Sequence, residues 1–105
     1  MNWYNKKTKN LFKTILALKN EKEAKQFLRD LLTESEIAEF SNRWQAAQML
    51  NADIPYTKIT KETGLSSTTV ARISKWLSKG MSGYKLMLDR LANHHNKPSR
   101  GKGLR

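Results

Sequence analysis

The sequence predicts an all-α protein, because apolar residues recur at helical spacing in every patterned segment and no segment alternates apolar with polar residues. Its 105 residues are enough for one domain. The apolar fraction of 38% is below that of a typical globular chain, so the core should be thin. Small helical domains with thin cores often complete them by forming dimers.

Six segments have the pattern of a helix. The third has the clearest start, because Thr33 can cap it and Glu36 follows three residues later, as in a capping box. Five apolar side chains should form a stripe along one face of this helix: Ile37, Phe40, Trp44, Ala47 and Leu50. The six predicted helices cover residues 3–18, 21–31, 34–51, 56–63, 67–79 and 83–94.

The net charge of +11 is unevenly distributed along the chain. Residues 1–20 carry five lysines and no acid, whereas residues 21–55 carry four basic and seven acidic side chains. Residues 56–92 carry seven basic and two acidic side chains, and residues 93–105 add four basic ones. Basic segments therefore lie on both sides of an acidic one, a layout that suits binding to a polyanion such as nucleic acid.

Several classes of protein are disfavoured. The chain has no cysteine, which excludes disulfides, thiolate metal sites and a cysteine nucleophile. The adjacent pair His94 and His95 cannot share one helix face as metal ligands do, and no nucleophile has a recognisable setting. No apolar run approaches the roughly 18 residues that span a bilayer, and a signal-peptide pattern is missing. We expect that the protein is not an enzyme and binds neither a metal nor a cofactor. We expect it to lie in the cytoplasm, associated with the nucleoid.

Residues 56–77 read YTKITKETGLSSTTVARISKWL and predict a helix-turn-helix over about residues 56–79. This motif needs two short helices held by a tight turn. Gly64 stands where the turn requires a positive φ, which glycine adopts without penalty. Five apolar side chains should pin the two helices together: Ile59, Leu65, Val70, Ile73 and Leu77.

The start of the second helix of this motif is suited to reading bases in the major groove of DNA. Ser66 should cap that helix, and short or hydroxylated side chains followed by one arginine remain exposed. Hydroxyls can donate or accept hydrogen bonds, and methyl groups suit the thymine methyl. The predicted DNA-binding residues are Ser66, Ser67, Thr68, Thr69, Ala71 and Arg72 near the bases, with Thr57, Lys58, Lys61 and Lys75 near phosphates. An ordinary helical hairpin is the alternative.

Two runs, LRDLLTESEIAEFSNRWQAAQML and IPYTKITKETGLSSTTVARISKWLSKG, carry a family resemblance. Over residues 27–91 the chain resembles the Trp repressor superfamily, and within it the YerC/YecD-type TrpR-related proteins. The resemblance implies a six-helix domain over residues 1–94 and an intertwined homodimer, in which the first three helices interlock with those of the partner. It also implies two reading heads that meet successive major grooves. Residues 95–105 should form a basic, disordered tail.

The resemblance extends to an effector pocket, but with departures. The Trp repressor binds tryptophan between two arginines, matched here by Arg43 and Arg72, and Thr33 matches a third pocket residue. Ligand-binding members have glycine where this chain has Ile73, and a small polar residue where it has Trp76. Trp76 either fills the ligand volume or packs against the last helix or the partner subunit. We expect a vestigial pocket and no tryptophan corepressor.

The sequence therefore predicts a homodimeric, sequence-specific regulator of transcription that binds double-stranded DNA, acts as a repressor and is not gated by tryptophan. One alternative is a nonspecific or replication-linked DNA-binding protein. An alternative of another class is a basic amphipathic protein on a membrane surface, with Trp3, Tyr4, Leu11 and Phe12 inserted. We expect no membrane partner.

Overall fold

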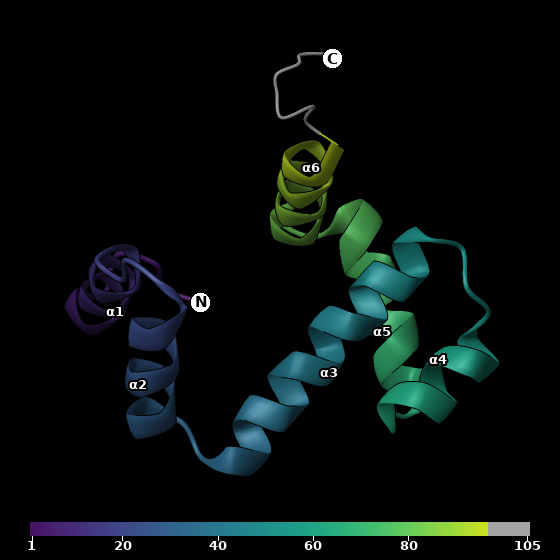
Figure 1. Cartoon of the computed structure of the whole chain (residues 1–105), viewed down its shortest axis with the longest axis horizontal. Coiled ribbons are helices and arrows are strands. Elements are labelled where there is room, and N and C mark those ends of the chain that lie inside the picture. The colour runs from purple at the N-terminus through teal and green to yellow at the C-terminus, as the bar shows by residue number, and fades with distance from the viewer. Residues whose placement is uncertain (97–105) are drawn as a thin grey trace. The chain divides into compact units, whose positions relative to one another are not determined.

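The structure, a computed structural model, describes residues 1–96 and shows only α-helices in that range, which confirms the all-α prediction (Figure 1). None of the helices in this range is both long and apolar enough to cross a membrane. Most of the predicted tail, residues 95–105, lies outside the described residues. The helices are α1 (Lys6–Leu16), α2 (Glu21–Leu31), α3 (Glu34–Asn51), α4 (Tyr56–Thr63), α5 (Ser67–Lys79) and α6 (Gly83–Asn96).

Helix α1 is shorter than the sequence pattern predicts. It begins at Lys6 because the Asn5 side chain accepts a hydrogen bond from the backbone N–H of Lys7 at 2.8 Å, as an N-cap does. The Asn2 side chain likewise accepts from the Tyr4 N–H at 3.0 Å. These asparagine contacts offer the backbone an alternative to the helix, so the predicted start at residue 3 is wrong.

Side-chain caps also set the starts of α2 and α3. Asn20 Oδ1 accepts from the Glu23 N–H at 2.9 Å, while Glu23 Oε1 accepts from the Lys19 N–H at 2.9 Å. In α3, Thr33 Oγ1 accepts from the Glu36 N–H at 3.1 Å, and Glu36 Oε1 accepts from the Thr33 N–H at 2.9 Å. This reciprocal pair confirms the predicted capping box.

The described residues divide into two compact units, the first over residues 1–38 and the second beginning at residue 39. The first unit contains α1, α2 and the start of α3, and none of its side chains is fully buried. Its clearest contact is between Trp3 and Phe12, whose rings stack with centroids 5.8 Å apart. The first unit therefore has no hydrophobic core of its own.

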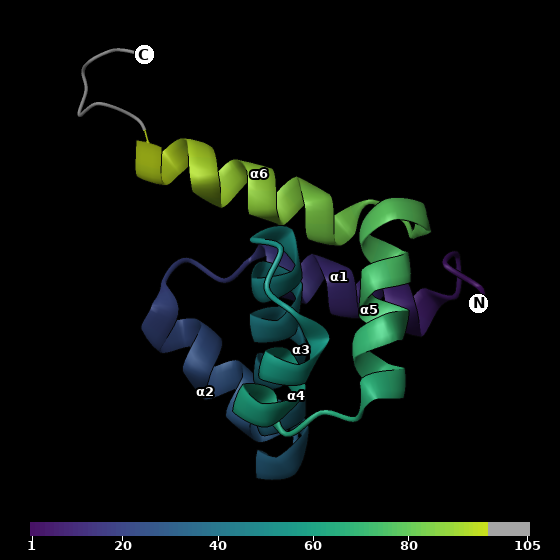
Figure 2. The same ribbon diagram turned by 90° about the vertical axis from the view of Figure 1, so that its right-hand side faces the viewer.

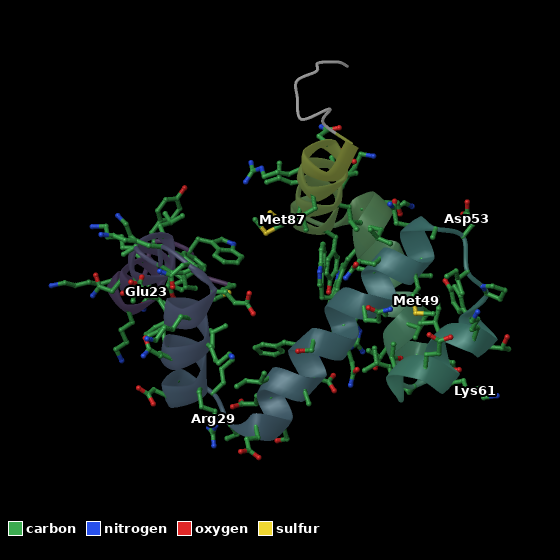
Figure 3. All side chains as sticks on the ribbon, in the orientation of Figure 1. Glu23, Arg29, Met49, Asp53, Lys61 and Met87 are labelled. Carbon is green, nitrogen blue, oxygen red and sulfur yellow. The ribbon has the colours of Figure 1, made fainter. Side chains whose placement is uncertain are left out.

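The second unit holds the core, where α5 contacts both α4 and α6 (Figure 2). The Met49 side chain of α3 points toward α4 and α5 in Figure 3. Small side chains on α3 let its neighbours approach closely, since Ala46 and Ala47 are both 0% exposed. The buried apolar residues are Ala46, Ala47, Met49, Ile59, Leu65, Val70 and Ile73.

The apolar stripe of α3 is only partly covered within one chain. Of its five residues only Ala47 is fully buried, and Phe40 is 50% exposed. Trp44 and Leu50 are partly buried and pack against the edge of the core. The core instead uses Ala46 and Met49 from the C-terminal half of the helix, because α4 and α5 pack there. Much of the apolar surface of α3 thus remains uncovered in a single chain.

Candidate nucleic-acid interface

The turn between α4 and α5 has the geometry that a helix-turn-helix requires. Gly64 adopts the left-handed conformation, with φ +75°, and its N–H donates to the Thr60 carbonyl at 2.9 Å. The hydroxyl of buried Thr63 donates to the Ile59 carbonyl at 2.7 Å and accepts from the Leu65 N–H at 3.2 Å. Thr63 therefore fixes both sides of the turn, a role that the sequence analysis missed.

Apolar side chains hold α4 and α5 as one rigid unit. Ile59 of α4 and Val70 and Ile73 of α5 are 0% exposed, and Leu65 of the turn is 8% exposed. These four burial predictions are confirmed. Leu77, near the end of α5, is only half-buried and lies outside the buried cluster.

The start of α5 is capped as predicted. Ser66 Oγ accepts from the Thr69 N–H at 3.1 Å and donates to Thr69 Oγ1 at 3.0 Å. Both hydroxyls are therefore engaged within the chain, and Thr69 is half-buried. Ser67, Thr68 and Ala71 are exposed, which leaves them as the short side chains that a bound molecule can approach closely.

The structure brings the ten predicted DNA-binding residues together on the α4–α5 unit, and all of them except Thr69 are exposed. The Lys61 side chain of α4 points outward in Figure 3. Lys58 Nζ lies 3.8 Å from Glu62 Oε2, but both side chains are exposed. An exposed pair of this kind contributes little stability, so a phosphate can replace Glu62 as the partner of Lys58.

The predicted effector-pocket residues have different surroundings. Ile73 is fully buried in the core. Thr33 belongs to the first unit, where it caps α3. Arg43 Nε lies 3.0 Å from Glu39 Oε2 on the same helix, whereas the Arg72 guanidinium lies 6.0 Å from the centroid of the Trp76 ring.

An apolar pocket of about 840 Å³ lies where α5 turns into α6. It is lined by Lys75, Trp76, Lys79, Gly80, Met81, Gly83, Tyr84 and Met87. Trp76 thus lies beside residues of α6, as one of the two sequence interpretations expected. This pocket was not predicted from the sequence, although Met81, Tyr84 and Met87 recur at a spacing of three residues.

Tyr84 connects this pocket to α3. Its ring stacks on that of Trp44, with centroids 6.2 Å apart. Burial raises the pKa of the Tyr84 phenol above its ordinary value of 10.0, and the nearby positive charge of Arg43 opposes that shift. The phenol is therefore neutral at physiological pH, and Tyr84 acts as an uncharged packing residue.

Comparison with known proteins places this helical arrangement in a family. The model of the Trp repressor protein family matches residues 6–92. The uncharacterized protein YerC of Bacillus subtilis (strain 168) is 38% identical over 86 residues, which cover 82% of this chain and 83% of YerC.

Two solved structures are also similar. The crystal structure of a TrpR-like protein from Eubacterium eligens ATCC 27750 has a TM-score of 0.82 and 34% identity, covering 86% of this chain and 93% of that one. A Trp repressor candidate from Staphylococcus aureus has a TM-score of 0.75 and 38% identity, covering 80% and 84%. With the six helices of residues 1–96, its sequence similarity and its matching fold, the chain belongs to the Trp repressor family.

Proposed function

We propose that this protein is a sequence-specific regulator of transcription that binds duplex DNA as a homodimer and represses the genes it controls. Trp repressor-like proteins are regulatory DNA-binding proteins rather than enzymes, which supports this class of function. The observation that carries the proposal is the exposed start of α5, held rigidly against α4 and flanked by exposed lysines. We place its action in the cytoplasm, at the nucleoid.

In this proposal α5 enters the major groove with its N-terminal residues toward the bases. Ser67 and Thr68 can hydrogen-bond base edges, and the Ala71 methyl can contact a thymine methyl. Arg72, one turn further along, can reach guanine or a phosphate. The phosphate backbone of the DNA would be contacted by Thr57, Lys58, Lys61 and Lys75. The hydroxyls of Ser66 and Thr69, which are hydrogen-bonded to each other, keep the start of α5 in place.

The homodimer is supported by the apolar surface that one chain leaves uncovered. The first unit has no fully buried side chain. Five large apolar residues of α1, α2 and α3 are between 36% and 50% exposed: Leu11, Phe12, Ile15, Leu31 and Phe40. A second copy would bury this surface, and a symmetric pair would present two α5 helices to an inverted repeat.

Selection from a random duplex library, followed by titration at physiological salt, tests the proposal. We expect an inverted repeat with half-site centres about 10 base pairs apart and a preference over shuffled duplex of roughly 10³-fold or more. Sedimentation of the free protein should show a dimer.

The alternatives give different outcomes. A preference of only a few-fold would indicate a nonspecific DNA-binding protein instead of a regulator with an operator. Absence of duplex binding, together with flotation on anionic liposomes, would favour the membrane-surface alternative. A monomer that binds single half-sites would overturn the dimer.

Tryptophan independence is the second part of the proposal. The side chain of Ile73 is locked in the core and Trp76 lies against Arg72, so the residues that depart from the ligand-binding pattern are bulky and already in contact with the chain. We expect calorimetric titration with L-tryptophan to give no binding heat in the micromolar range. The affinity for duplex DNA should be the same with and without L-tryptophan. Tight tryptophan binding would make this chain a ligand-gated member of its family.

A further inference from the structure

Arg72 has an aromatic neighbour on its own helix. The carbon at the centre of its guanidinium lies 6.0 Å from the centroid of the Trp76 ring, within the range of a cation–π contact. The two residues are four positions apart, so they share one face of α5. Arg72 is also the first cation on this helix, since the turns before it carry only uncharged side chains.

The backbone around Trp76 is closely packed where α5 ends. A Cβ atom at Gly80 would lie 2.7 Å from the Trp76 carbonyl oxygen and 3.2 Å from the Trp76 Cβ. Only a residue without a side chain fits so close to the last turn of α5. Trp76 also lines the pocket at the α5–α6 junction with Met81, Tyr84 and Met87. Trp76 thus has neighbours both on its own helix and on α6, although 42% of its surface is exposed.

We propose that Trp76 is a positioning residue for Arg72. The inference rests on the proposed function, in which Arg72 contacts DNA. A free arginine side chain has many rotamers and loses that freedom when it binds. The indole restricts the guanidinium before DNA arrives, so less freedom is lost on binding. Trp76 raises the affinity of the DNA face without itself touching DNA.

A double-mutant cycle tests this role. Duplex affinity is measured for the full chain, Trp76→Leu, Arg72→Ala and the double variant, on the sequence selected by the wild type. We expect Trp76→Leu to weaken binding about two- to five-fold, the size of an exposed cation–π contact. Arg72→Ala should weaken it about ten-fold or more. Adding Trp76→Leu to Arg72→Ala should cause no further loss, because the residue that Trp76 positions is gone.

Two further measurements separate positioning from general destabilisation. Trp76→Phe, which keeps an aromatic face, should bind within about two-fold of the wild type. The dependence of affinity on salt should be unchanged in Trp76→Leu, because the number of phosphate contacts is the same. Thermal unfolding of each variant reports whether it is folded. If the leucine variant does not fold, Trp76→Met, with a flexible side chain of similar reach, takes its place in the cycle.

The inference is overturned if Trp76→Leu binds like the wild type, if its loss is as large in the Arg72→Ala background, or if Trp76→Phe loses as much as Trp76→Leu. In each of these cases the wild type still binds its duplex, so the proposed function stands. A wild type that binds no duplex would instead overturn the proposed function and this inference together.

Discussion

Thr68→Asp is expected to abolish duplex binding while leaving the fold intact. Thr68 is exposed at the second position of α5, where the proposed complex brings the helix closest to the bases and between two phosphate backbones. A carboxylate there would face like charge and lose its hydration, a combination that costs several kcal/mol. We expect affinity to fall by more than about 100-fold in a titration at physiological salt.

Stability should not fall with affinity in this variant. An acidic side chain in the first turn of a helix interacts favourably with the partial positive charge of the N-terminus. The melting temperature of Thr68→Asp should therefore equal or slightly exceed that of the wild type. Loss of binding together with loss of folding would not support the proposed role of α5.

Ser35→Asp is the matched control. Ser35 is exposed at the second position of α3, so this substitution adds the same charge at the same place in a helix, outside the α4–α5 unit. The control should change affinity only through the net charge, by a few-fold at most. Normal DNA binding by Thr68→Asp, or an equal loss in Ser35→Asp, would show that α5 is not the reading helix.

Local chemistry made much of the fold predictable from sequence. The capping box at Thr33, the serine cap at Ser66 and the left-handed Gly64 depend on neighbours within three or four residues, and the structure confirms all three. The start of α1 shows the limit of this reasoning. Its apolar pattern extends to Trp3, but the side chain of Asn5 caps the backbone first.

Packing between helices was less predictable. A helical stripe tells which residues share a face, but the neighbours decide which part of that face is covered. In α3 the two alanines Ala46 and Ala47 are covered because α4 and α5 approach there, whereas Phe40 is left half exposed. If the proposed dimer forms, the apolar pattern of α3 encodes contacts with a second chain that one chain cannot satisfy.

In the candidate site, too, local features were predictable and contacts between helices were not. Residue types and spacing predicted an exposed, hydroxyl-rich start of α5 and the lysines around it. They did not predict the pairing of Trp44 with Tyr84, since that contact joins α3 to α6 across a long stretch of sequence. The spacing of four residues made a contact between Arg72 and Trp76 possible to predict, but the contact also depends on rotamers that the sequence does not specify.

Ile73→Ala is expected to cause the largest loss of stability among the substitutions considered. Ile73 is 0% exposed and belongs to the cluster that joins α3, α4 and α5. Removing its outer carbons leaves a cavity where the two alanines of α3 already bring the helices close, so the surroundings have little room to collapse. Isoleucine-to-alanine changes in such cores cost about 2–5 kcal/mol of the free energy of unfolding. In a small domain that corresponds to a fall in melting temperature of roughly 10 °C or more.

Substitution of the neighbouring residue, Arg72, should have the opposite effect on stability and DNA binding. Arg72 and Ile73 are adjacent in sequence but lie on different faces of α5, about 100° apart around the helix, and one is exposed while the other is buried. Chemical denaturation should therefore show a large loss in the free energy of unfolding for Ile73→Ala and almost none for Arg72→Ala. The duplex affinity of the folded protein should instead fall strongly for Arg72→Ala and little for Ile73→Ala. Ile73→Val, which removes one methylene, should cost only about 0.5–1.5 kcal/mol. A stable Ile73→Ala protein would contradict the role of Ile73 as a core residue that joins the three helices.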